Sequence, residues 1–233
     1  MFSRLKKAFS REPRASAEAE SPISQIAPGP VSEWAGTQGF GFSVDAKGNG
    51  LSLEGKVGGK PWRMQVGAAS RPYMRGDEIR ARAELGIRED MAVVVMNRAL
   101  KVALDKQAYE TYTDQLQTSV DTSLPEEMRW LAIYNEVGWD SLPREFWNRY
   151  SVLADSRESA VAWIEPGLAR MLLDWPVPGP ADEVPFMIFL MRGKGYLRME
   201  YSPPDLAVLQ HGAMIFTQAC EAALASFGHK PAA

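Results

Sequence analysis

Two stretches of alternating apolar and polar residues constrain this 233-residue chain most strongly, and they lie on either side of Gly58-Gly59. From Leu51 to Val57, and again from Trp62 to Val66, every second residue is apolar or glycine. A period of two is that of a β-strand with one buried face. Two glycines can take the positive φ angles of a tight hairpin turn. The pattern therefore predicts an antiparallel hairpin.

Other segments show the same strand signals. The sequence predicts further strands at Phe40–Val44, Ile79–Leu85, Met91–Met96 and Tyr150–Ala154. The continuous apolar run at Met91–Met96 is typical of a strand covered on both faces. A second hairpin is predicted from Phe186–Met191 and Tyr196–Tyr201, which flank the turn residues Arg192-Gly193-Lys194-Gly195.

Helical patterns occupy much of the remaining chain. They predict helices over Ala99–Tyr112, after a Ser123 cap, after Ser141-Leu142-Pro143, over Ser156–Ile164 and over Gly167–Trp175. A longer helix opens after Asp205, where apolar residues from Leu206 to Phe227 recur at steps of three and four. The fold class expected is α+β, with a mostly antiparallel sheet built from hairpins, packed by helices, and with a long C-terminal helix.

Composition divides the chain into four parts. Residues 1–14 carry five basic side chains against the single acid Glu12, whereas the whole chain has a formal charge of −3. Residues 15–30 are rich in Ala, Ser, Glu and Pro, which is typical of a flexible linker. We expect one folded domain over 31–227 and a disordered C-terminus over 228–233.

The N-terminal tail has the pattern of a basic amphipathic helix. Its apolar residues recur at spacings of three and four, with basic residues between them. The residues expected to contact an anionic membrane surface or an acidic partner are Phe2, Arg4, Leu5, Lys6, Lys7, Phe9 and Arg11. Each basic residue near an anionic leaflet contributes about 1 kcal/mol. The alternative is an unstructured, solubilising tail.

Aromatic residues are dense in the middle of the chain. Trp130 and Tyr134 are four residues apart, on one face of a predicted helix, and Trp139 follows. Because Trp and Tyr anchor many protein interfaces, these three residues are a candidate partner-binding patch. The alternative is that they pack between helices and sheet.

No motif in the sequence indicates a catalytic centre, a metal site or a cofactor. Cys220 lies on the apolar stripe of the last helix, and His211 is nine residues earlier, so it points to nearly the opposite face. Two histidines and one cysteine do not make a typical zinc site. The segment Asp45–Gly50 resembles the start of a calcium loop, but Lys47 and Lys56 replace acidic ligands. We expect a turn there.

Nucleic acid is not an expected partner. The segment Gln38–Val44 is similar to an aromatic RNA-stacking motif, but Gln38 replaces its basic residue and Ser43 offsets the valine. The small negative charge of the chain also argues against nucleic-acid binding. A glycine-rich strand is the simpler interpretation.

The order of features in the second half resembles an uncharacterised family of bacterial membrane-associated proteins. The features are Phe146, the strand Tyr150–Ala154, the break Asp155-Ser156, the step Glu165-Pro166-Gly167-Leu168, the run Met171-Leu172-Leu173, and a hairpin that ends at Tyr201. The strands around Gly55–Val66, Ala81–Leu85 and Val93–Asn97 fit the same order, so the resemblance covers about half the chain. The family implies no activity or catalytic residue, and its members carry N-terminal transmembrane helices that this sequence lacks.

These observations favour a non-enzymatic interaction or adaptor protein with an unknown protein partner. No apolar run approaches the roughly 20 residues that cross a bilayer, and no cleavable signal peptide is recognisable. We therefore expect a bacterial cytoplasmic protein, peripheral to the membrane if the tail binds lipid. The alternative is an enzyme whose site is assembled from dispersed polar residues.

Overall fold

The described part of the chain forms a single antiparallel sheet of nine strands, in the order β1-β2-β3-β4-β9-β8-β5-β7-β6. The structure is a computed structural model that describes residues 28–46, 48, 50–114, 126–177 and 179–228. The strands are β1 (Gly41–Val44), β2 (Leu51–Val57), β3 (Lys60–Ala68), β4 (Asp77–Ala83), β5 (Ala92–Asn97), β6 (Asn135–Val137), β7 (Tyr150–Ala154), β8 (Phe186–Met191) and β9 (Lys194–Tyr201). The helices are α2 (Pro28–Thr37), α3 (Arg98–Asp114), α4 (Glu126–Ile133), α5 (Arg144–Arg149), α6 (Arg157–Trp163), α7 (Pro166–Leu173) and α8 (Leu206–Phe227). The α+β class is confirmed.

Both predicted hairpins are present. In the β2–β3 turn, Gly58 and Gly59 have φ angles of 54° and 76°. The β8–β9 turn is shorter than predicted, because β9 already begins at Lys194 and leaves only Arg192 and Gly193 in the turn.

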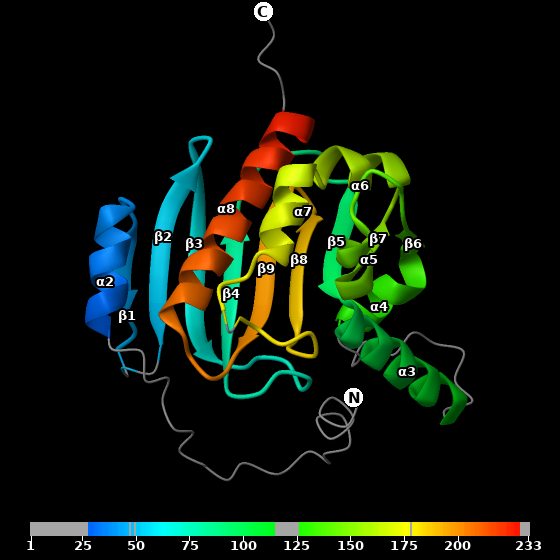
Figure 1. Ribbon diagram of the computed structural model, residues 1–233, viewed down its shortest axis with the longest axis horizontal. Coiled ribbons are helices and arrows are strands. Elements are labelled where there is room, and N and C mark those ends of the chain that lie inside the picture. Colours follow the sequence, from blue (N-terminus) through cyan, green and yellow to red (C-terminus); the bar gives the residue numbers. More distant parts are fainter. Residues whose placement is uncertain (1–27, 47, 49, 115–125, 178, 229–233) are drawn as a thin grey trace, which may run out of the picture.

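Helices cover the whole length of one sheet face, which we call the back face. The long helix α8 packs against β2, β4 and β9, with α6 and α7 beside it (Figure 1). It begins as predicted after Asp205, whose side chain accepts a hydrogen bond from the backbone N–H of Val208 (3.0 Å). Its buried residues, among them Leu209, Phe216 and Cys220, belong to the larger of two hydrophobic cores. This core holds α8 against the sheet.

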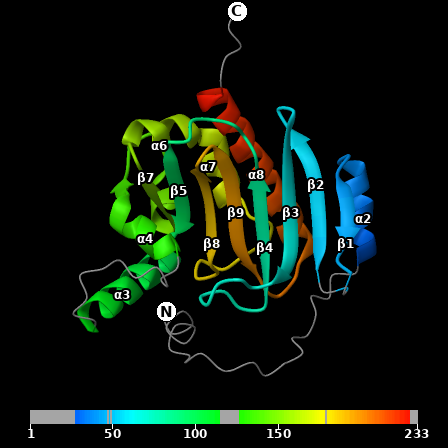
Figure 2. The same cartoon turned by 180° about the vertical axis from the view of Figure 1, so that it is seen from behind.

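Among the described residues, helices cover the opposite face, the front face, over β8, β5 and β7. Helices α3 and α4 pack there over a smaller core that contains Leu104, Trp130, Met96 and Met187. Because both cores meet at β5, all of its residues are buried, as its apolar run predicts. Over β2, β3, β4 and β9 no helix of the described chain crosses the front face (Figure 2).

Two elements differ from the sequence predictions. Helix α2 begins at Pro28, so residues 28–30 of the predicted linker form its first turn, where proline lacks only an N–H that would have no helical partner. Helix α4 ends at Ile133, and Asn135–Val137 then pairs with β7. This strand has only three residues, too few to show an alternating pattern, and its hydrogen bonds with β7 stabilise it.

Several predictions concern residues that the structure does not describe. The tail over 1–14, most of the linker, the Ser123 cap and residues 229–233 lie outside the described residues. Within the described residues, no helix has the length and apolar character needed to cross a bilayer.

Candidate functional site

The antiparallel register aligns the side chains of the front face in rows that run across the strands. One row contains, in order from β2 to β5, Ser52, Gln65, Arg80, Arg198, Met187 and Met96. The neighbouring row contains Glu54, Arg63, Arg82, Tyr196, Phe189 and Val94. Both rows change from polar to apolar between β9 and β8. That is where the cover of α3 and α4 begins.

The open part of these rows brings like charges together. Arg80 on β4 lies directly opposite Arg198 on β9, and Arg63 on β3 lies directly opposite Arg82 on β4. Like charges in directly opposed positions destabilise a sheet by roughly 0.2–1 kcal/mol per pair. The fold therefore keeps two arginine pairs that its own stability does not favour.

Ion pairs neutralise some of these arginines but not Arg80. Arg63 Nε lies 3.5 Å from Glu54 Oε1, and Arg82 Nε donates a hydrogen bond to Glu84 Oε1 (2.7 Å). Arg80 is half-buried and forms no ion pair with any described residue. Its Nε also has no hydrogen-bond partner among them. Arg80 is thus available to an anionic group.

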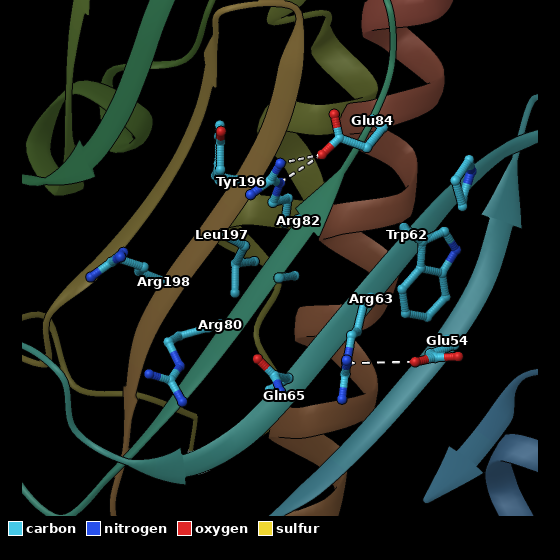
Figure 3. A pocket seen from close by; sticks show the side chains of 12 residues that line it. Glu54, Trp62, Arg63, Gln65, Arg80, Arg82, Glu84, Tyr196, Leu197 and Arg198 are labelled. Atoms are coloured by element: carbon cyan, nitrogen blue, oxygen red, sulfur yellow. Dashed lines mark hydrogen bonds and ion pairs between the residues drawn. The ribbon is translucent and has the colours of Figure 1, made fainter.

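These side chains line an open hollow of about 590 Å³, which we call the arginine hollow. In Figure 3, Arg80 and Arg198 lie on the left, the Arg82–Glu84 pair toward the top and the Arg63–Glu54 pair on the right. The hollow contains acids as well as arginines, but the acids are already engaged. Arg80 can therefore accept a carboxylate without first losing a counter-ion, whereas Arg63, Arg82 and Arg198 each already have one.

A second hollow of about 390 Å³, the aromatic hollow, adjoins the first. The two share Tyr196 and Arg198 as lining residues. Its aromatic residues include Trp130 from α4 and Phe189 from β8. Phe189 stacks on Tyr196 with ring centroids 4.7 Å apart and lies 4.8 Å from the Trp130 ring.

Two fully buried carboxylates contact Arg198, the arginine that lines both hollows. Glu78 and Glu127 both have 0% of their surface exposed. Arg198 Nη1 lies 3.6 Å from Glu78 Oε1 and 3.9 Å from Glu127 Oε1. Arg71 Nε donates a hydrogen bond to Glu127 Oε1 (2.8 Å). These contacts fix Arg198 from below and tie α4 to the loop between β3 and β4.

Exposed Ser70 and buried Tyr73 lie beside these carboxylates. The backbone N–H and the hydroxyl of Ser70 both donate to Glu78 Oε2, at 2.8 and 2.7 Å. Burial raises the pKa of Tyr73, and the charge of Glu127 raises it further. A phenol in this place stays neutral at physiological pH. The two carboxylates and Tyr73 are therefore supports for the arginines rather than groups exposed to a ligand.

Comparisons with known proteins give a distant structural likeness. No family model and no curated protein match the chain. Among solved structures, the chain is similar to the mycobacterial trehalose monomycolate transport factor A, with a TM-score of 0.45 and 9% identity over 86% of this chain and 96% of that one. A likeness at this level carries no argument about function. The family resemblance of the second half stays a prediction.

The structure does not bring the three predicted patch aromatics together. Trp130 and Tyr134 line the aromatic hollow, and Trp130 is also part of the front core. Trp139 is buried in the back core, where its ring lies 5.0 Å from that of Trp147. It lies on the other side of the sheet because β6, which the sequence did not predict, separates it from α4. The three residues therefore do not form one patch.

The cysteine, the histidine and the aromatic residue discussed as candidate functional groups all contact other parts of the fold. Cys220 is 1% exposed in the back core, as predicted, and burial raises the pKa of its thiol. His211 Nε2 is hydrogen-bonded to the carbonyl oxygen of Met171 (2.8 Å). Phe40 packs edge-on against Trp62. Within the described ranges, no group of three or more His, Cys, Asp or Glu side chains could hold a metal ion.

Sequence reasoning missed the arginine pairs and the buried carboxylates. Arg63, Arg80, Arg82 and Arg198 all occupy polar positions of alternating strands, so their exposure on one face was readable. Glu127 lies in the first turn of α4, where an exposed acid is usual, but it is fully buried. The missing information is the pairing of β4 with β9, which only the complete sheet provides.

Proposed function

We propose that this chain is a non-enzymatic interaction protein that binds an acidic segment of a partner protein in the arginine hollow. The observation that carries the proposal is the set of opposed arginine pairs around Arg80. An anionic partner would relieve the repulsion within each pair. Charge-assisted hydrogen bonds from arginine to carboxylate would add affinity, and they are roughly twice as strong as neutral ones.

Mixed charge on the open face favours a protein partner over a nucleic acid. Glu54 and Glu84 project among the arginines (Figure 3). A phosphate backbone carries a regular series of negative charges and would meet both carboxylates. A protein segment can instead place acids at Arg80 and Arg198 and neutral or basic residues beside the two glutamates.

The alternative, an enzyme with dispersed site residues, requires an ionisable group that meets its substrate. Glu78 and Glu127, which lie beneath the hollows, are fully buried and occupied by Ser70, Arg71 and Arg198. Glu54 and Glu84, which line the arginine hollow, are held in ion pairs with Arg63 and Arg82. This arrangement supports binding more than acid–base chemistry.

Peptide selection from a random display library, with the full chain as bait, tests the proposal. Selected sequences should be enriched in Asp and Glu. The enrichment should disappear with Arg80→Glu and persist with Arg170→Glu, a matched charge reversal at an exposed position of α7 on the back face. Acidic sequences selected equally well by the Arg80→Glu variant, or no acidic enrichment with the wild type, would contradict it.

We also propose that the basic tail brings this protein to an anionic membrane surface in the bacterial cytoplasm. The support is the charge and apolar spacing of residues 1–14. Co-sedimentation with anionic and neutral vesicles is the test. Equal pelleting with both vesicle types, or no change when residues 1–14 are deleted, would contradict the proposal.

A further inference from the structure

We infer that the aromatic hollow binds an aromatic side chain of the same acidic partner segment. The inference deepens the proposed function and rests on it, because it names a second requirement of the partner. The two hollows share Tyr196 and Arg198, so one extended segment can occupy both.

The first support is a short series of rings that ends at the hollow. Trp130, Phe189 and Tyr196 lie at successive centroid distances of 4.8 and 4.7 Å, within the range of favourable aromatic pairs. Trp130 and Phe189 are buried, whereas Tyr196 is only half-buried. Because Tyr196 lines both hollows, a partner ring packed against its exposed part would lie where the two hollows meet.

The second support is an apolar side chain at the mouth of the hollow. Ile133, the last residue of α4, lines the hollow and is 66% exposed. Half-buried Met191 and Tyr134 also line it. Apolar anchors in a pocket surrounded by charged residues are the usual centres of binding energy at protein interfaces. Here the ion pair of Arg129 with Glu126 supplies part of that surrounding rim.

The third support is Arg192, in the β8–β9 turn. Its φ of 51° lies in the left-handed region, at a turn position where glycine or asparagine is usual. Arg192 lines the hollow, is exposed and forms no ion pair with the described residues. Guanidinium groups stack readily on aromatic faces. An aromatic ring in the hollow would give this exposed guanidinium group a stacking partner.

Acids in the lining argue against a small anion as the ligand. Glu89, Asp90 and Glu126 line the aromatic hollow together with its arginines. A free phosphate or similar ion would meet both signs of charge at once. A neutral ring avoids this conflict, and its flanking acids would reach Arg80 and Arg198 next door.

The same display library tests this inference separately from the proposed function. With the wild type, the selected acidic peptides should share a Phe, Tyr or Trp at a constant spacing from the acids. The Ile133→Glu variant should still select acidic peptides but without the aromatic position. Val161→Glu, at an exposed aliphatic position of α6, is the matched control and should select both features.

A selected peptide then provides the affinity measurement. Replacing its aromatic residue by alanine should raise Kd by at least about tenfold for the wild type and change it little for Ile133→Glu. Melting temperatures equal to that of the wild type would show that both variants fold. Acidic peptides without a shared aromatic residue, or a Kd unaffected by the alanine replacement, would overturn this inference and leave the arginine hollow intact. Loss of acidic enrichment would overturn both.

Discussion

The two halves of the front face have the same backbone but different side chains. Over β8, β5 and β7 the rows continue as Met187, Met96, Phe189 and Val94, and the protein's own helices α3 and α4 cover them. Over β2, β3, β4 and β9 the same rows contain arginines, and none of the described helices lies over them. The comparison teaches that side-chain chemistry, rather than sheet geometry, decides which half is core and which half is available to a partner.

Ion pairs and a stacked pair of aromatic rings lie at the boundary between the two halves. Arg198 is held by Glu78 and Glu127, while Tyr196 stacks on Phe189. The open half is therefore not a loose extension of the fold. It is fixed at its inner border by the same helix, α4, that covers the other half.

The largest expected effect comes from moving an arginine into the covered half. Met187→Arg places an unpaired charge at a position with 0% exposure, and such burial costs several kcal/mol. We expect loss of the cooperative thermal transition, measured by circular dichroism. Arg80→Met, the reverse change in the same row, should fold normally. A cooperative Met187→Arg transition close to that of the wild type would show that the covered half is not a dry core.

The next effect concerns the border. Glu127→Ala removes the buried counter-ion of Arg71, whereas Arg198 keeps its contact with Glu78. The expected loss of stability is therefore about 3 kcal/mol, the lower end of the range for a broken buried pair. Glu126→Ala is the matched control one residue earlier, where an exposed pair with Arg129 is worth at most about 1 kcal/mol. Urea denaturation measures both. Similar losses for the two variants would show that the buried pairs do not hold the border.

The free energy of unfolding should fall at alkaline pH, because buried tyrosine and cysteine side chains are neutral in the folded protein and ionise more easily in the unfolded chain. Burial raises the pKa values of Tyr73, Tyr201 and Cys220 above their ordinary values. Above about pH 10 the unfolded tyrosine ionises first, so stability falls with rising pH, by up to about 1.4 kcal/mol per pH unit for each group. Tyr73→Phe should reduce this slope. An unchanged slope from pH 9 to 11 would contradict the contribution of Tyr73.

The smallest expected effect on stability is the one most specific to the open half. Arg80→Glu places opposite charges at the Arg80–Arg198 position and should leave stability unchanged or raise it by about 0.2–1 kcal/mol. The same variant should no longer select acidic peptides from the display library. Stability that falls well below that of the Arg170→Glu control would indicate that Arg80 serves the fold rather than a partner.

Much of the local structure was readable from the sequence. The period-two stretches predicted both hairpins, and the apolar run predicted that β5 is covered on both faces. The stripe from Leu206 to Phe227 predicted α8. The two errors have different causes: α2 begins within the proline-rich segment assigned to the linker, and β6 is a three-residue strand that depends on its pairing with β7.

The sequence by itself determined which residues alternate, which run continuously and where each long helix begins, because these patterns depend on residues only a few positions apart. Only the tertiary structure decided that Asp77–Ala83 pairs with Gly195–Tyr201, more than a hundred residues along the chain. That pairing places Arg80 opposite Arg198 and brings Glu127 beneath them. Cross-strand partners are chosen by the packing of the whole sheet, so the arginine hollow exists only in the folded chain.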